Sequence, residues 1–231
     1  MEDELLADQV AYYRARASTY DEWWQRREAY DRGPEMASEW DRQIDTVEAA
    51  LRDFAVGGNV LELAGGTGWW TERLAQTADR LTVIDSSPEA LERNRARAGR
   101  TDVDYRVADL FRWAPEESYD VVFFSFWLSH VPRSRVSAFW SMVRSCLAEG
   151  GRVFLIDNHQ DPLPAEDTGD PYVCRYETDR HIRQVKDGRR RYQVVKVMYE
   201  PDELESLLQE LGWTSRVSAT RWFIFGSAQP A

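Results

Sequence analysis

A glycine-rich segment is the part of this chain best suited to bind a small ligand. Residues 60–68 read VLELAGGTG, so an apolar run that is predicted to be a strand ends in glycines. Glycine lets the backbone pass close to a ligand because no Cβ stands in the way. A helix that begins near Trp69 would also turn its first N–H groups toward an anionic group of that ligand. Taken alone, the same segment is equally well explained as a plain turn.

Three further polar residues stand at the ends of predicted strands. Asp85 closes LTVID, 17 residues after Gly68, and an acid at that place binds ribose hydroxyls in nucleotide-binding folds. Asp109 follows the next strand, where a carboxylate can accept a hydrogen bond from the adenine amine while Leu110 packs on the ring. Ser125 ends the strand after that. Each is also explained as a cap or turn residue. Ligands of open α/β sheets bind where strands end, however, so the four ends together predict one site.

The elements that must position these residues alternate along the chain. Strands are predicted over residues 60–63, 81–84, 103–107, 120–125 and 152–157, with helices over 70–78, 88–98 and 133–147. Runs such as VVFF and VFLI are nearly continuous in apolar residues, which is typical of strands covered on both faces. This alternation indicates right-handed crossovers and a parallel sheet.

The segments on either side of this core read differently. Residues 3–54 have helical periodicity, broken at Gly33-Pro34. After residue 157, a polar stretch with three prolines predicts a loop, and Asp187-Gly188 joins two strands predicted within 181–199. A helix is expected to start at Pro201, followed by closing strands over 213–219 and 221–226.

Composition excludes several classes of protein. A net charge of −11 disfavours nucleic acid and anionic membranes as partners. Two cysteines build neither a zinc cluster nor a disulfide framework, so no metal is expected. The acidic start MEDELLADQV is not a signal peptide, and no apolar run approaches the ~20 residues of a membrane span. We therefore expect a cytoplasmic protein, either a monomer or a homodimer.

Five segments, taken in order and spacing, resemble the successive motifs of class I S-adenosylmethionine (SAM)-dependent methyltransferases. They are VLELAGGTG at 60–68, VIDSSPEAL at 83–91, VADLF at 107–111, YDVVFFSFWLSHV at 119–131 and LAEGGRVFLID at 147–157. The N-terminal YYRARASTYDEWW also resembles the helix that closes over SAM in the small-molecule branch. The start of the chain and FWLSHVP are similar to uncharacterised actinobacterial members. One departure is Gly66, where many members have Cys.

The resemblance implies a fold and a set of cofactor contacts. The fold is α/β: a doubly wound, mostly parallel, seven-stranded Rossmann-like sheet with N-terminal helices and a β-hairpin insert as substrate cap. The expected single domain comprises a helical cap (1–56), a SAM-binding core (57–157), the insert (158–200) and a closing helix with strands (201–231). The implied contacts are Glu62 and Gly65 at the methionine and amino end, Asp85 and Ser86 at the ribose and adenosine, Asp109 and Leu110 at adenine, Ser125 and Phe126 near the methionine portion, and Tyr13 and Tyr20 above SAM.

Methyl transfer from a sulfonium needs alignment more than acid–base help, because the leaving thioether is neutral. A base is required only for an acceptor that is protonated at neutral pH. His130 is the candidate, since histidine titrates near neutrality and lies just past Ser125. A histidine that caps a helix or shapes the pocket remains the alternative. Weaker base candidates are His159 and Asp157, whereas His181 is expected to be structural or exposed. The aromatic residues expected to line the acceptor pocket are Trp24, Trp40, Trp127 and Tyr172.

The predicted function is therefore methyl transfer from SAM to an oxygen or nitrogen of a small molecule. A nicotinamide-dependent oxidoreductase would need the third glycine of G-x-G-x-x-G, but Thr71 stands in its place. An enzyme that methylates amino groups of bases would carry an Asn/Asp-Pro-Pro-Tyr motif where this chain has SFWL. A non-catalytic SAM-binding protein and a protein methyltransferase remain open.

Overall fold

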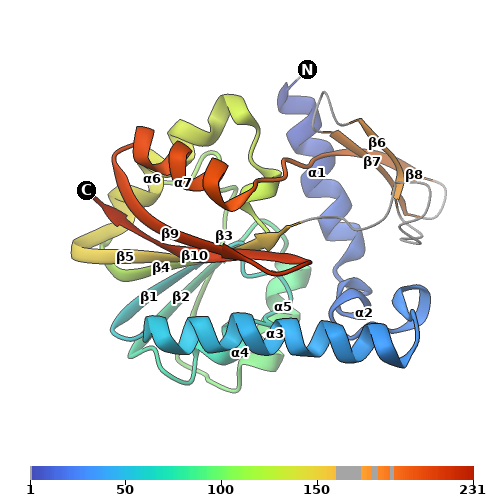
Figure 1. The fold of residues 1–231 in the computed structure, drawn as a ribbon, viewed down its shortest axis with the longest axis horizontal. Coiled ribbons are helices and arrows are strands. Elements are labelled where there is room, and N and C mark those ends of the chain that lie inside the picture. The colour runs from blue at the N-terminus through green and yellow to red at the C-terminus, as the bar shows by residue number, and fades with distance from the viewer. Residues whose placement is uncertain (1, 160–172, 178–181, 188–189) are drawn as a thin grey trace.

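The computed structural model describes residues 2–159, 173–177, 182–187 and 190–231. Its centre is a seven-stranded sheet with the order β3-β2-β1-β4-β5-β10-β9 (Figure 1). Only β10 runs against its neighbours in this sheet, because it pairs antiparallel with both β5 and β9. The predicted doubly wound, mostly parallel sheet is confirmed. The strand bounds are β1 Asn59–Leu63, β2 Arg80–Asp85, β3 Asp104–Val107, β4 Tyr119–Ser125, β5 Leu147–Asn158, β9 Trp213–Ala219 and β10 Phe223–Pro230.

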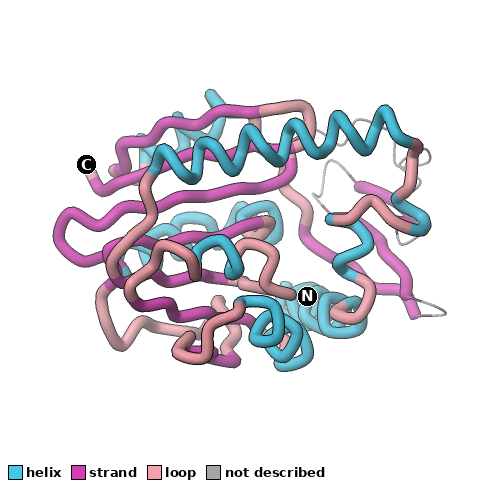
Figure 2. The backbone as a smooth tube through the Cα atoms, turned by 90° about the horizontal axis from the view of Figure 1, so that it is seen from below, coloured by secondary structure: helices cyan, strands magenta, loops and turns pink. Residues whose placement is uncertain are grey.

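Helices cover both faces of this sheet (Figure 1). One face carries α3 (Pro34–Phe54), α4 (Thr71–Leu74) and α5 (Pro88–Ala98), and the other carries α6 (Val136–Cys146) and α7 (Pro201–Glu210). Trp40 and Phe54 of α3 pack on rings of β10 and β5, and Figure 2 shows this helix crossing that part of the sheet.

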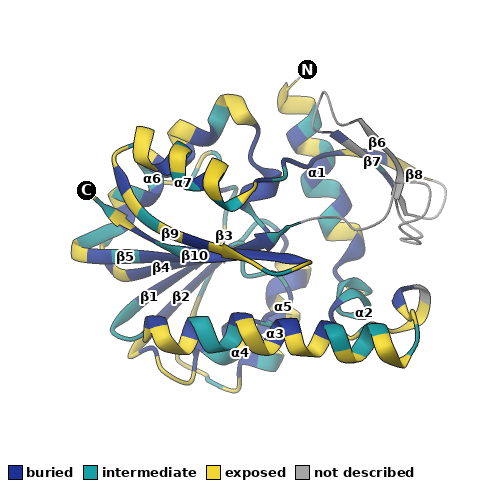
Figure 3. Ribbon diagram, in the orientation of Figure 1, coloured by how far each residue is buried: buried dark blue, intermediate teal, exposed yellow. Residues whose placement is uncertain are grey.

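The apolar run of β4 shows why strands of this kind need two covered faces. Val121 and Phe123 belong to the core cluster on the α3 side, whereas Val122 and Phe124 belong to the cluster on the α6 side. Side chains of a strand alternate between faces, so a run without polar residues feeds both cores. Figure 3 shows the result, with buried strands between helices whose outer faces are exposed.

The N-terminal segment crosses the end of the sheet where the parallel strands finish. It contains α1 (Glu2–Arg16), α2 (Tyr20–Trp24) and a short 3-10 helix, η1 (Glu28–Tyr30). Gly33 then turns the chain at φ +85°, and Pro34 starts α3 as the sequence predicts. Two more 3-10 helices, η2 (Leu128–His130) and η3 (Arg133–Arg135), follow β4.

The insert forms a separate three-stranded antiparallel sheet that lies against α1 (Figure 1). Its strands are β6 (Val173–Glu177), β7 (Ile182–Asp187) and β8 (Arg190–Val195). The predicted pair corresponds to β7 and β8, and its turn lies outside the described residues. Sequence reasoning missed β6, whose five residues directly follow the polar, proline-containing stretch that was predicted to be a loop.

Three other predicted boundaries were wrong, and the first is the start of β5, which lies at Leu147 rather than at Arg152. The helix expected over 70–78 ends at Leu74, because the carbonyls of Ala75 and Ala78 accept hydrogen bonds from Arg100 at 3.1 and 2.6 Å. The last strand runs to Pro230 rather than to Gly226, since its backbone stays paired with β9 to that point. Among the described residues, no helix has the length and apolar content that crossing a membrane requires.

Candidate active site

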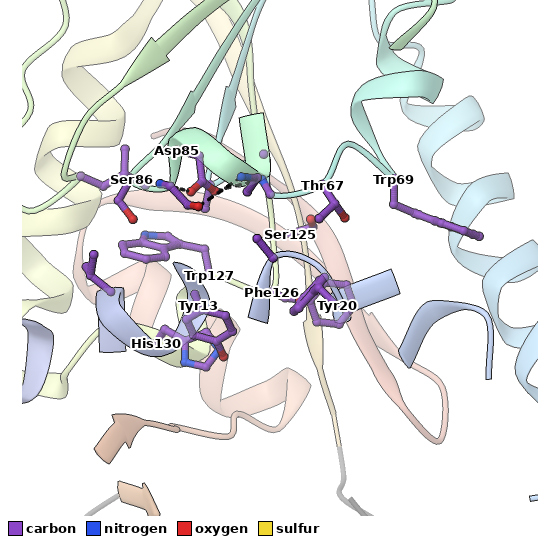
Figure 4. A pocket seen from close by; sticks show the side chains of 18 of the residues that line it. Tyr13, Tyr20, Thr67, Trp69, Asp85, Ser86, Ser125, Phe126, Trp127 and His130 are labelled. Atoms are coloured by element: carbon purple, nitrogen blue, oxygen red, sulfur yellow. Dashed lines mark hydrogen bonds between the residues drawn. The ribbon is translucent and has the colours of Figure 1, made fainter. Parts of the chain in front are cut away.

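A pocket with an empty volume of about 920 Å³ lies between the strand ends and the helices α1 and α2 (Figure 4). It brings together nine of the ten predicted cofactor contacts, as well as His130, from elements far apart in the chain. The predicted residues on its wall are Tyr13, Tyr20, Gly65, Asp85, Ser86, Asp109, Leu110, Ser125, Phe126 and His130.

The glycine turn is folded tightly against α5. Gly66 and Gly68 have φ values of +52° and +89°, in the region that glycine tolerates best. A Cβ on Gly68 would come within 2.8 Å of the Cα of Asn94, so no larger residue fits there. The Asn94 amide donates to the carbonyls of Gly65 and Gly66 at 3.1 and 3.3 Å. The turn is therefore shaped by α5 as well as by its own glycines.

Asp85 is the central polar group of this turn. Its carboxylate accepts N–H donors from Gly66 at 2.9 Å and from Ser87 at 2.8 Å. Burial raises the pKa of this carboxyl, and these backbone donors partly offset that rise. The turn therefore gives the Gly66 N–H to Asp85 rather than to an anionic ligand group. The helix expected to begin near Trp69 begins at Thr71 and has a single turn.

Glu62 does not line the pocket but lies beneath the turn, 1% exposed. Its Oε2 accepts a 2.5 Å hydrogen bond from Thr71, whose hydroxyl in turn accepts from Asn94 at 2.7 Å. Its Oε1 is buried and has no hydrogen-bond partner among the described residues. Burial raises the pKa of Glu62 to about 8, since a charged carboxylate is poorly solvated there. Glu62 therefore supports the glycine turn through its hydrogen bond to Thr71.

The ends of the next strands supply the other side of the pocket. Asp109 is half-exposed and accepts from the backbone N–H of Phe111 at 3.0 Å, while Leu110 beside it is buried. Phe126, directly after Ser125, has φ +52°, an unusual conformation for a bulky residue. Its N–H donates to the carbonyl of Ile156 at 2.8 Å. Strain of this kind is retained mostly where function requires it.

The N-terminal helices form the opposite wall and are tied to the core by side chains. Arg14 donates to the Ser86 carbonyl at 2.6 and 3.1 Å. Asp21 accepts from the Thr67 hydroxyl at 2.6 Å and pairs with Arg97 at 2.6 Å. These contacts hold α1 and α2 across the glycine turn.

His130 is 7% exposed and lies behind Tyr13 on the pocket wall (Figure 4). Its Nε2 is 2.8 Å from the Tyr13 hydroxyl, and its Nδ1 is 2.7 Å from the Val195 carbonyl of β8. The two rings meet edge-on at 69°, with centroids 5.1 Å apart. The base candidate therefore has contacts to both the N-terminal helix and the insert.

The weaker base candidates have other contacts. His159 lies between the Thr220 carbonyl at 2.7 Å and Glu200 at 3.0 Å, away from the pocket. Asp157 accepts from the Ser129 N–H at 2.8 Å and is 3.9 Å from Lys196, inside the fold. Of the predicted aromatic residues, Trp24 and Trp127 line the pocket, but Trp40 belongs to the core. Tyr172 and His181 lie outside the described residues.

Several residues of the site were missed by sequence reasoning. Thr67 and Trp69 belong to the glycine segment itself, so their position beside Gly66 was a signal for the wall. Trp69 stacks on Trp24 at 5.0 Å, with the ring planes 3° apart. Asn94 faces the turn from α5, where helical periodicity alone marks it only as a buried position.

The comparisons with known proteins agree with this geometry. Residues 60–151 match the family model described as a methyltransferase domain. The structure described as "DhpI-SAH complex structure" is 35% identical and covers 100% of this chain and 99% of its own, with a TM-score of 0.76. The chain belongs to the class I SAM-dependent methyltransferases, and the predicted family and cofactor, SAM, are confirmed. A second structure, described as "DhpI-SAM-HEP complex", is 36% identical over 98% of each chain, with a TM-score of 0.78.

Curated relatives match over shorter stretches. The ubiquinone biosynthesis O-methyltransferase of Xanthomonas oryzae is 32% identical over 127 residues, which cover 52% of this chain and 50% of the relative. Nodulation protein S of Bradyrhizobium diazoefficiens is 32% identical over 87 residues, 37% of this chain and 41% of the relative. The chain thus spans half or less of the length of these two relatives. Similarity to actinobacterial members stays a prediction.

Proposed function

We propose that this chain binds SAM in the pocket and transfers its methyl group to an oxygen or nitrogen of a small molecule. The observation that carries the proposal is the convergence of four strand ends and two N-terminal helices on one pocket. Relatives described as an O-methyltransferase and as complexes with SAM or SAH support it. In this proposal, the insert with its three-stranded sheet covers the acceptor.

The residues of the wall fit this cofactor. None of the described residues lining the pocket is Lys or Arg, whereas aromatic rings and two carboxylates are present. Aromatic faces attract cations, and a sulfonium carries a positive charge. In this proposal, Asp85 accepts hydrogen bonds from the ribose hydroxyls, and Asp109 with Leu110 holds adenine. When bound, SAM supplies an activated methyl group on a cationic sulfur.

The contribution of the protein is mainly positioning and exclusion of water. Proximity and orientation can supply roughly 7–11 kcal/mol of a barrier. Tyr13 and Tyr20 cover the pocket from the N-terminal side, and Trp127 closes it beside Ser125 (Figure 4). His130 is the base for an acceptor that is protonated at neutral pH. An ionised carboxylate acceptor would not need it.

Calorimetry and a product screen test the proposal. We expect SAM and SAH to bind, and NAD not to bind. Small acceptors incubated with methyl-labelled SAM should then yield a methylated product together with SAH. Binding of SAM without turnover of any acceptor would favour the non-catalytic alternative, and label transferred only to a protein would favour a protein methyltransferase. An absence of SAM binding would refute the proposal.

A further inference from the structure

The protonation of His130 follows from its neighbours. A backbone carbonyl can only accept a hydrogen bond, so the contact to Val195 at 2.7 Å requires the proton on Nδ1. In the neutral ring, Nε2 is then an acceptor. The Tyr13 hydroxyl, 2.8 Å away, must therefore be the donor to Nε2. One chain of hydrogen bonds runs from Tyr13 through the imidazole to β8.

A buried glutamine holds this arrangement together. Gln9 of α1 is 2% exposed and uses both ends of its amide. Its Nε2 donates to the backbone carbonyl of His130 at 3.2 Å, and its Oε1 accepts from the Val195 N–H at 3.0 Å. Gln9 thus ties both His130 and Val195 to α1, the helix that carries Tyr13. Buried polar groups with satisfied partners are rigid, which a proton pathway needs.

This geometry leaves an acceptor no direct route to the imidazole. Both ring nitrogens of His130 are engaged, and Tyr13 lies at the pocket wall in front of Nε2 (Figure 4). A base that works through Nε2 must therefore receive its proton by way of the Tyr13 hydroxyl. A tyrosine hydroxyl both donates and accepts, so it can pass a proton on.

We propose that Tyr13 and His130 form a proton relay for a methyl acceptor that is a neutral hydroxyl compound, either an alcohol or a phenol. The inference rests on the proposed function and extends it to the acceptor class. Tyr13 contacts the acceptor, and His130 stores the proton. Gln9 is a positioning residue that keeps Tyr13 and His130 within hydrogen-bond distance.

The step balances in atoms and charge. The acceptor oxygen forms a bond to the methyl carbon while the carbon–sulfur bond breaks, and sulfur keeps that electron pair. The acceptor proton passes to the Tyr13 oxygen as the Tyr13 proton passes to Nε2 of His130. One cation, the sulfonium, is replaced by another, the imidazolium, which the Val195 carbonyl stabilises through Nδ1–H. The products are a methyl ether and neutral SAH, and the imidazolium returns its proton to water between turnovers.

The test compares Tyr13→Phe with Tyr12→Phe in the full chain. Tyr12 is the next residue of α1, and its hydroxyl interacts with Arg16 rather than with His130. For a hydroxyl acceptor, we expect kcat to fall ~10²–10⁴-fold in Tyr13→Phe, the usual size of an acid–base contribution. The kcat of Tyr12→Phe should stay within a few-fold of the wild-type value. Calorimetry with SAH should show similar affinities for both variants and thereby separate a lost relay from a lost cofactor.

A second measurement does not need the acceptor. In spectra of the protein labelled with ¹⁵N-histidine, His130 should show the Nδ1–H tautomer, with Nε2 shifted by its hydrogen bond. Tyr13→Phe should move the Nε2 resonance, whereas Tyr12→Phe should leave it at the wild-type position. An Nε2–H tautomer, or equal turnover in the two variants, would overturn the relay. Methylation of carboxylates alone would also overturn it. If wild type binds SAH but methylates nothing, the proposed function fails and the relay with it; if hydroxyl compounds are methylated equally by both variants, only the relay fails.

Discussion

The two walls of the pocket are built in different ways. The sheet wall consists of the ends of β1, β2 and β4, which are paired on both sides, and of the edge strand β3, with Asp85 held by two N–H donors. The lid wall, α1 and α2, is attached through side chains such as Arg14 and Asp21. Tyr12 of α1 packs in a small cluster with three residues of β7 and β8, while Leu6 of α1 and Trp24 of α2 belong to the two larger clusters.

This difference separates two tasks. The groups proposed to bind SAM lie mainly on the wall with the larger buried core, which keeps them in fixed positions. α1 covers the pocket and rests in part on the smaller cluster, and regions of low local stability are the ones expected to open first. Tyr13 and His130 connect the two walls, so the proposed chemistry is possible only when the lid is closed.

The largest effect is expected from truncating a core ring. Phe123→Ala should lower the free energy of unfolding by about 3–5 kcal/mol, since Phe123 is fully buried in the sheet. Tyr192→Ala, in the cluster under α1, should cost less than about 2 kcal/mol because this region can open locally. Urea unfolding measures both. Equal losses would show that the two walls unfold as one unit.

Loss of the ribose acceptor comes next. Asp85→Ala should weaken SAH binding by about 100-fold or more, because hydrogen bonds to charged groups contribute about 1.5–3 kcal/mol each. Asp109→Ala is the matched comparison. Because the Asp109 side chain is half-exposed, its loss should weaken SAH binding about tenfold less than the loss of Asp85. Calorimetry with SAH gives both values. If the Asp109 variant binds more weakly than the Asp85 variant, the assignment of ribose to Asp85 is wrong.

The buried carboxyl of Glu62 predicts a pH effect on stability. In the unfolded chain it loses its proton near pH 4.5, but in the folded chain it keeps the proton up to about pH 8. The unfolded state therefore binds fewer protons between these values, so the stability contributed by this group falls as pH rises through that window. Glu62→Gln should flatten this dependence, measured by urea unfolding at several pH values. Glu72→Gln, on the exposed side of α4, should keep the slope of wild type.

The smallest effect should come from one tie of the lid. Arg97→Gln removes the ion pair between Arg97 and Asp21. The Arg97 side chain is 22% exposed and the Asp21 side chain 23%. Such pairs contribute about 0.2–1 kcal/mol, so SAH should dissociate up to about five times faster. Stopped-flow tryptophan fluorescence can follow this, because Trp24 and Trp69 line the pocket. Arg80→Gln breaks a pair remote from the lid and should leave the rate unchanged.

Much of the fold was predictable from local patterns. Four of the five core strands, α5 and the helix starting at Pro201 are where the apolar runs and prolines place them, whereas β5 begins earlier, at Leu147. The ends of α4 and β10 were not predictable, because Arg100 and the pairing with β9 determine them from a distance. Similarly, the motif residues Asp85 and Asp109 could be named in advance, whereas the supporting role of Asn94 could not.

Sequence alone determined the parts of this protein that depend on short stretches: the strand and turn of residues 60–68, the acids after the strands, and the family to which they belong. Tertiary structure decided how those parts work together. Tyr13 and His130 are 117 positions apart, and Gln9 and Val195 are 186 apart. Contacts over such distances arise only when the sheet packs against α1 and the insert. Hydrogen-bond geometry at His130 therefore follows from the folded core and not from any local pattern.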